Sequence, residues 1–312
     1  MSRSPLPPFC TVRALAQGCL LAVSALLLGS CKKDQPETPA PAPLVVYAAG
    51  WDVTANVRVA KVWKNGTATA LADGTYDARA YALAVAGPDV YVAGYEANAA
   101  NRNVAKVWKN GTATALTDGT RNAVAYALAV AGPDVYVAGS ERNAAGKEVA
   151  KVWKNGTATA LTDGTRSAVA YDLAVAGPDV YVAGYEANAA GRFVAKVWKN
   201  GTAIPLTDGT QIARASGLAV VGADMYVVGY EDNTAGRAVA KVWKNGTATA
   251  FTDGTQIARA SGLAVVGADV YAAGYEVSGG NVLVAKYWKN GTATALTDGA
   301  RDGTVEVLVV AP

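Results

Sequence analysis

The sequence contains no histidine, and its three cysteines all lie within the first 31 residues. The rest of the 312-residue chain therefore offers neither an imidazole nor a thiolate. These groups are the usual ligands of zinc, iron and copper and the usual members of nucleophilic triads. The composition argues against a transition-metal site, a cysteine nucleophile and a Ser-His-Asp triad, so we expect no metal and no cofactor.

Charge is also scarce. Charged residues make up 17% of the chain, and the formal net charge is +3. A nearly neutral protein has little electrostatic attraction for nucleic acid or for an anionic membrane surface. We therefore expect no nucleic-acid partner. We also expect the protein to be a monomer. The hydrophobic share of 51% is enough for a sizeable core.

The first thirty residues have the pattern of a signal peptide. Arg3 and Arg13 precede an apolar run over residues 14–28, which is short for a permanent membrane span. Leu-Gly-Ser-Cys at residues 28–31 resembles the bacterial lipobox, which implies that Cys31 becomes the lipidated N-terminus after cleavage. An ordinary secretory signal with an incidental cysteine is the alternative.

The lipobox resemblance also implies a location. Residues 31–43 are polar and rich in proline, and we expect them to form a tether behind the lipidated cysteine. The protein would then be exported and held by its lipid anchor at the bacterial cell envelope, at the outer membrane or the cell surface.

Residues 44–312 consist of six copies of one repeat. A Trp-Lys-Asn-Gly-Thr string recurs every 45 residues, with its tryptophans at Trp63, Trp108, Trp153, Trp198, Trp243 and Trp288. In one copy, four short apolar or alternating segments cover residues 83–86, 90–94, 104–108 and 112–116. Asn110-Gly111 joins the last two, and this dipeptide favours a tight hairpin. The repeat therefore predicts four antiparallel strands.

Four short strands per repeat are typical of a β-propeller blade. Residues 45–50 match the second strand of the repeat, and residues 307–310 match its first strand. Pairing them would complete one blade and close a ring, whereas a β-solenoid would need capping repeats. We predict an all-β, six-bladed β-propeller of four-stranded blades, closed by pairing the N-terminal strands with the C-terminal strand.

The Val-Tyr-Val-Ala-Gly and Trp pattern resembles kelch-type blades and the tandem propeller repeats of exported bacterial lipoproteins. The resemblance covers residues 44–312. It departs from kelch at Ala93-Gly94, where kelch has two glycines, and in its 45-residue period. It implies a fold and a location but no chemistry.

Residues that recur in every copy have a structural explanation. We expect the repeated tryptophan to pack between blades. Asp118 and its equivalents precede glycine in a turn. The copies differ most in two loops, between the second and third strands and between the fourth strand and the next repeat. We call the side where these loops meet the variable-loop face and the opposite side the hairpin face.

The variable-loop face combines three kinds of side chain. Each second strand ends in an acid, usually after an aromatic residue, and Ser140 breaks the aromatic series. The aromatics are Trp51, Tyr95, Tyr185, Tyr230 and Tyr275. Each loop before a first strand supplies one arginine, at Arg79, Arg121, Arg166, Arg214, Arg259 and Arg301. These side chains suit a polar ligand such as a glycan or a peptide. Alternatively, the aromatics pack between blades and the acids pair with the arginines.

We expect a non-catalytic module that binds a glycan, peptide or protein partner on the variable-loop face. A hydrolase or lyase using carboxylates of this face is the alternative, although a catalytic pair needs two unlike acids and these acids repeat in every blade. Asp77 and Asp302 are the non-repeated acids of the loops before the first strands. A purely structural envelope domain is the third possibility.

Overall fold

The computed structural model describes residues 45–305, and every regular element there is a β-strand. The predicted signal peptide, Cys31, the tether and the strand at residues 307–310 lie outside the described residues. Within those residues, no helix has the length and apolar composition needed to cross a bilayer.

The strands form six antiparallel sheets in which neighbours in sequence are neighbours in space, and each sheet is one blade. Blade 1 contains β1 (Tyr47–Thr54), β2 (Val57–Lys64) and β3 (Thr67–Ala70). Blade 2 contains β4 (Ala78–Ala86), β5 (Asp89–Ala97), β6 (Asn103–Lys109) and β7 (Thr112–Ala115). Blade 3 contains β8 (Ala123–Ala131), β9 (Asp134–Arg142), β10 (Glu148–Lys154) and β11 (Thr157–Ala160).

The other three blades repeat this order. Blade 4 contains β12 (Ala168–Ala176), β13 (Asp179–Ala187), β14 (Phe193–Lys199) and β15 (Thr202–Pro205). Blade 5 contains β16 (Ala213–Val221), β17 (Asp224–Asp232), β18 (Ala238–Lys244) and β19 (Thr247–Ala250). Blade 6 contains β20 (Ala258–Val266), β21 (Asp269–Val277), β22 (Leu283–Lys289) and β23 (Thr292–Ala295).

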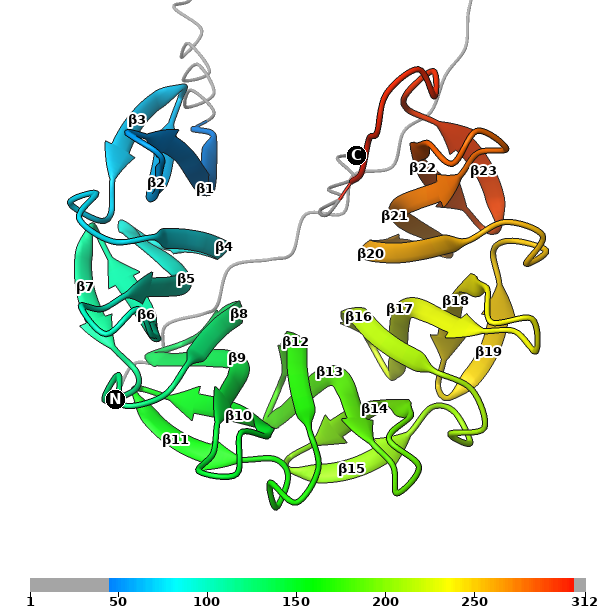
Figure 1. The fold of residues 1–312 in the computed structure, drawn as a ribbon, viewed down its shortest axis with the longest axis horizontal. Helices are drawn as coiled ribbons and strands as arrows, with labels where there is room; N and C mark the ends of the chain where they lie inside the picture. The colour runs from blue at the N-terminus through cyan, green and yellow to red at the C-terminus, as the bar shows by residue number, and fades with distance from the viewer. Residues whose placement is uncertain (1–44, 306–312) are drawn as a thin grey trace, which may run out of the picture. The chain divides into compact units, whose positions relative to one another are not determined.

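The six sheets follow one another around a common centre, with β4, β8, β12, β16 and β20 innermost (Figure 1). The all-β, six-bladed propeller architecture is therefore confirmed. Blade 1 has three strands among the described residues, so ring closure stays a prediction. The last described residue, Val305, accepts a 2.7 Å hydrogen bond from the Ser261 hydroxyl on β20.

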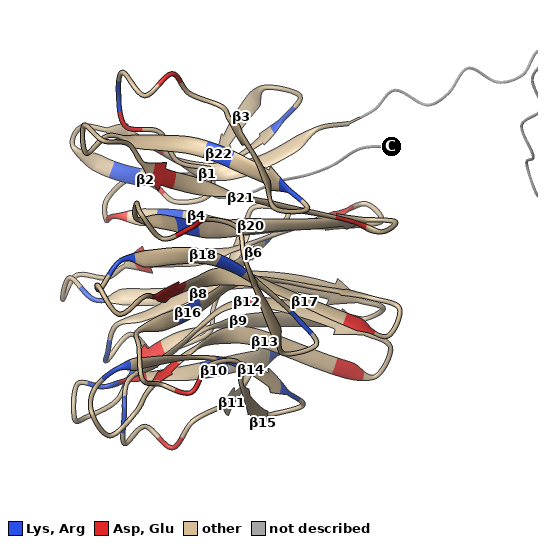
Figure 2. Cartoon of the chain, turned by 90° about the vertical axis from the view of Figure 1, so that its right-hand side faces the viewer, with Lys and Arg blue, Asp and Glu red and all other residues tan. Residues whose placement is uncertain are grey.

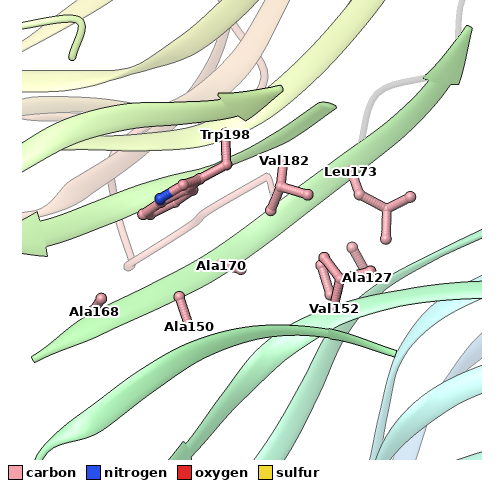
Figure 3. Packing of buried hydrophobic residues seen from close by; sticks show 9 residues of the cluster. Ala127, Ala150, Val152, Ala168, Ala170, Leu173, Val182 and Trp198 are labelled. Carbon is pink, nitrogen blue, oxygen red and sulfur yellow. The ribbon is translucent and has the colours of Figure 1, made fainter. Parts of the chain in front are cut away.

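Blades 1 to 6 are joined by a core in which the tryptophans of blades 2 to 6 each pack against the preceding blade. Trp198 on β14 is fully buried and packs with Ala150 and Val152 of blade 3 (Figure 3). The small alanines leave room for the indole ring, and each such ring removes a large apolar area from water. Five of the six repeated tryptophans are fully buried, while Trp63 of blade 1 is half-buried. The predicted packing of tryptophan between blades is confirmed.

The Asn-Gly hairpins have the backbone that their sequence predicts. Asn200 and Gly201 have φ values of 50° and 82°, as a type I′ turn requires. The Asn200 side chain also accepts a 2.9 Å hydrogen bond from the backbone of Val180, which ties two hairpins together. Charged positions lie in the loops and turns at both ends of the sheets and also within the sheets (Figure 2). Each of the third strands β6, β10, β14, β18 and β22 has a lysine at its middle residue.

The hairpin face carries one repeated cluster. In blade 4, the Lys199 ammonium lies 2.8 Å from the Asp179 carboxylate and 5.1 Å from the centre of the Tyr181 ring. Asn200 donates a 2.7 Å hydrogen bond to the same carboxylate. Blades 2 to 6 all contain this ion pair, so the charged groups of the hairpin face neutralise one another.

Candidate functional site

The two variable loops of each repeat lie against each other, as their place in the repeat predicts. The Asn98 amide, in the loop after β5, donates a 2.9 Å hydrogen bond to the Gly119 carbonyl, in the loop before β8. Asn143, Asn188 and Asn233 make the same bond in the next three repeats. These asparagines recur within loops that otherwise vary, which is a signal that sequence analysis could have used.

The repeated acids pair with lysines of the third strand and not with the arginines. In each blade the acid lies within the second strand, near its end, and it stands diagonally opposite that lysine across the strand pair. Except for Asp52, these acids are only 16–18% exposed. The six pairs are Asp52 with Lys61, Glu96 with Lys106, Glu141 with Lys151, Glu186 with Lys196, Glu231 with Lys241, and Glu276 with Lys286. Their partial burial gives a structural reason for the acid in every copy.

The five aromatic candidates differ in exposure. Tyr95, Tyr185 and Tyr230 are only 5%, 6% and 4% exposed, Tyr275 is half-buried, and Trp51 is 41% exposed. Burial raises the pKa of Tyr185 to about 12. The three buried rings expose little area to a ligand, and their burial fits the alternative in which the aromatics pack between blades.

The six arginines occupy two different positions. Arg79, Arg214 and Arg259 lie on first strands and stack over aromatic rings of the preceding blade, with Arg214 5.1 Å from the centre of Tyr185 and 4.8 Å from that of Phe193. Arg121, Arg166 and Arg301 lie earlier, in the loop, and are exposed. The second group is therefore the one that reaches solvent.

Three further tyrosines form a row that sequence analysis did not single out. Tyr81, Tyr126 and Tyr171 occupy the bulge of β4, β8 and β12, and their ring centres lie 5.5 and 5.4 Å apart in succession. Serines 216 and 261 take the same place in blades 5 and 6. The change from tyrosine to serine at this position is visible in the sequence and could have indicated the row. The three tyrosines belong to blades 2 to 4.

The two non-repeated acids, Asp77 and Asp302, hold the preceding blade. Asp77 accepts hydrogen bonds from the Tyr95 hydroxyl at 2.8 Å and from the Arg58 backbone at 3.2 Å. Burial acts to raise the pKa of Asp77, but these hydrogen bonds outweigh it and keep the pKa below its usual value. Asp302 accepts the corresponding bond from the backbone of Leu283 at 2.9 Å.

Blade 3 departs from the repeat at three neighbouring positions. Ser140 stands where the other blades have an aromatic ring, and its side chain is buried, with 2% exposed. Its hydroxyl donates a 2.9 Å hydrogen bond to Glu148, whose other oxygen accepts a 2.7 Å bond from Nε of Arg142. A small hydroxyl and an ion pair thus replace a bulky ring.

Two adjacent pockets lie at the junction of blades 2 and 3. The first, here called the arginine pocket, has a volume of about 230 Å³ and is lined by Arg102, Arg121 and Arg142 with Asn122 and Asn143. The second, here called the Tyr126 pocket, has a volume of about 210 Å³. Its lining includes Tyr126, Ser140 and Glu148, with Asn103 and the two residues shared with the first, Asn122 and Arg142. In residues 45–305 no three carboxylates lie close enough together to hold a metal ion.

Comparison with known proteins supports the architecture. No protein-family model and no curated protein matches the sequence. Among solved structures, TolB from Acinetobacter baumannii matches 83% of this chain with a TM-score of 0.52 and 11% identity. The Pyrococcus horikoshii acylaminoacyl peptidase matches 81% of it with a TM-score of 0.51 and 11% identity. The chain has a propeller-like fold.

The propeller-like chain spans less than two thirds of either of those proteins, since the matches cover 65% of TolB and 43% of the peptidase. At 11% identity the similarity concerns the fold alone. The function of this propeller therefore has to be argued from its own side chains.

Proposed function

We propose that the chain is a non-catalytic binding module of the bacterial cell envelope, with its ligand site on the variable-loop face. The observation that carries this proposal is the position of the two pockets. The arginine pocket is lined mainly by the loops in which the six copies differ, and the Tyr126 pocket by the ends of the strands beside these loops, at the junction of blades 2 and 3. Binding sites on rigid scaffolds are commonly built from such loops.

Charge pairing on the two faces supports the same choice. On the hairpin face, blades 2 to 6 pair each lysine with an aspartate of the same blade. On the variable-loop face, the exposed Arg121 contributes a guanidinium group to a pocket. A pocket with polar groups directed at a common space is better suited to recognition than a surface of satisfied pairs.

The acids of the variable-loop face favour binding over catalysis. Catalysis by two carboxylates needs one acid that is protonated near neutral pH. Asp77 has a lowered pKa, and the repeated glutamates are paired with lysines. Burial raises the pKa of Asp232 at the end of β17, so this one acid departs from the pattern. The cell-envelope location rests on the lipobox resemblance at Cys31.

A screen of the purified full chain against glycan and peptide arrays tests the proposal. We expect a ligand whose binding weakens at least tenfold in Arg121→Ala, with an unchanged melting temperature because Arg121 is exposed. Lys154→Ala on the hairpin face is the matched control and should bind as the wild type does. Loss of binding in the control, with retention in Arg121→Ala, would contradict the proposal.

A further inference from the structure

We propose that the arginine pocket and the Tyr126 pocket together bind one acidic sugar residue, with its carboxylate among the three arginines and its hydroxyl groups beside Tyr126. This inference rests on the proposed function and names the ligand class and the place of the site. The two pockets share Asn122 and Arg142, so one ligand can contact both.

The repeat itself indicates that this site is single. Arg102, Arg121 and Arg142 meet at the junction of blades 2 and 3. At the next junction the corresponding residues are Lys147, Arg166 and Ala187. At the one after that they are Arg192, Gln211 and Asp232. Of these three junctions, the one between blades 2 and 3 is therefore the one where all three positions are arginine. A site that arose in one pair of blades would show this pattern.

The charge of the arginine pocket favours an anionic group. Three arginines line it, and Glu148 neutralises one of them, Arg142. The guanidinium of Arg121 is exposed in the loop, so it can turn towards a ligand. Guanidinium groups bind carboxylates through two parallel hydrogen bonds, which gives the pocket a preference for that shape.

The Tyr126 pocket favours hydroxyl groups instead. Asn103 and Asn122 have amide donors and acceptors, Ser140 has a hydroxyl, and Glu148 accepts. Ser140 and Glu148 already bond to each other. The Asn122 side-chain oxygen accepts a hydrogen bond from the Asn103 backbone. Sugar hydroxyls can donate and accept, so they can bond to the remaining sites of these groups, while the sugar ring contacts Tyr126. Glu148 repels a second carboxylate here, which directs the anionic group of the ligand towards the arginines.

Size limits the ligand further. Pockets that hold drug-sized molecules have volumes of roughly 300–1,000 Å³. The two pockets measure about 230 and 210 Å³, so each takes only part of such a molecule. One pyranose unit with one carboxylate fits two small adjacent pockets better than a folded peptide does.

Titration calorimetry with the full chain tests the ligand class. The probes are short oligomers of galacturonate, glucuronate and mannuronate, with neutral galactose oligomers, a glutamate-rich peptide and inorganic phosphate as competitors. We expect at least one uronate oligomer to bind at least tenfold more tightly than every competitor, and its affinity to fall as salt rises. Failure of all three uronates to bind, or equal binding of the peptide or of phosphate, would overturn the inference.

Two substitutions test the place of the site. Ser140→Tyr restores the residue found in blades 2, 4, 5 and 6, so it should fold normally, fill the Tyr126 pocket and weaken uronate binding at least tenfold. Arg142→Ala, which introduces the residue of blades 2 and 4, should weaken it similarly. Arg237→Ala removes the blade-5 equivalent of Arg102 and is the control that should bind as the wild type does.

The outcomes separate this inference from the proposed function. If a ligand is lost in Arg121→Ala but binds Ser140→Tyr and Arg142→Ala normally, the sugar site is wrong and the variable-loop face remains the binding face. If a ligand is lost only when Lys154 on the hairpin face is replaced, both proposals fail.

Discussion

Asp172 is a carboxylate at a position where the repeat has none. It lies on β12, and the corresponding residues are Ala82, Ala127 and Gly217 in three other blades. Its two oxygens accept hydrogen bonds from the backbone of Leu173 at 2.8 Å and from that of Leu218 in blade 5 at 2.7 Å. Burial raises its pKa to about 6, although these two donors act against it. The side chain therefore joins blades 4 and 5, but it places an ionisable group in a buried position.

Replacing Asp172 with asparagine should change how stability depends on pH. The folded chain, with a pKa of about 6, holds this proton more tightly than the unfolded chain, whose usual value is 3.8. The stability contributed by the protonated group is complete below about pH 4 and is lost as the pH rises to about 6. Calorimetric melting should thus show the wild type losing about 2–3 kcal/mol relative to Asp172→Asn over this range.

Asp77→Asn is the control of opposite sign. The pKa of Asp77 is held below its usual value, so its ionised form stabilises the folded chain above about pH 4, and that stability is lost as the pH falls. The stability of the wild type relative to that of Asp77→Asn should therefore increase as the pH rises. Parallel pH profiles for the two variants would contradict the assignment.

Single residues differ in how far the sequence predicts their roles. The turn roles of Asn200 and Asp118 follow from local backbone chemistry, and the structure confirms both. The burial of Tyr185 depends on Arg214 of the next blade and on Phe193, which no local pattern reveals. Ser140 is visible as a break in the series, but its pocket depends on Tyr126 and Glu148, which lie on other strands.

At the scale of the strand, two kinds of invariant glycine have different causes. Gly184, in β13, has its backbone against the bulged strand β12, where an added Cβ would lie 2.0 Å from the Val169 carbonyl oxygen. Gly201, in a hairpin, has a φ of 82° and open space around the Cβ position. Close approach explains the first glycine and backbone conformation the second.

The two glycines should therefore respond differently to alanine. Gly201→Ala should destabilise the chain by about 1 kcal/mol, the usual cost of a left-handed residue that has room for its side chain. Gly184→Ala has to separate two paired strands and should cost several kcal/mol, in the range of severe core changes. Urea unfolding of both variants gives the comparison, and equal losses would show that the close contact in β13 relaxes easily.

At the scale of the whole chain, the anchor is predicted from the sequence alone. If Cys31 is lipidated, the wild type expressed in a bacterial host should incorporate labelled palmitate and fractionate with membranes. Cys31→Ala should do neither, because its sulfur is the acylated atom. The same membrane fraction for both forms would contradict the lipobox interpretation.

Closure of the propeller is the remaining feature of the whole molecule. The repeat places Leu308 in register with leucines that are buried or half-buried, such as Leu173, which is 6% exposed. Val310 is in register with Val85, which is 48% exposed, and with four half-buried valines. If residues 307–310 complete blade 1, they cover the side of β1 that has no described neighbour, and Trp63 becomes as buried as the other five tryptophans. The adjacent Val305 already accepts a hydrogen bond from Ser261 on β20.

Two substitutions in residues 307–310 test closure, one at a position expected to be buried and one as its control. Leu308→Asp should lower the stability by several kcal/mol, because it would place a carboxylate among apolar side chains of the completed blade. Val310→Asp adds the same charge two residues later, at a position whose equivalents are half-buried or exposed, so its effect should be clearly smaller than that of Leu308→Asp. Thermal unfolding, read from tryptophan fluorescence, separates the two. Equal and small effects would mean that residues 307–310 do not pack into blade 1, and the propeller would then be open between its first and last blades.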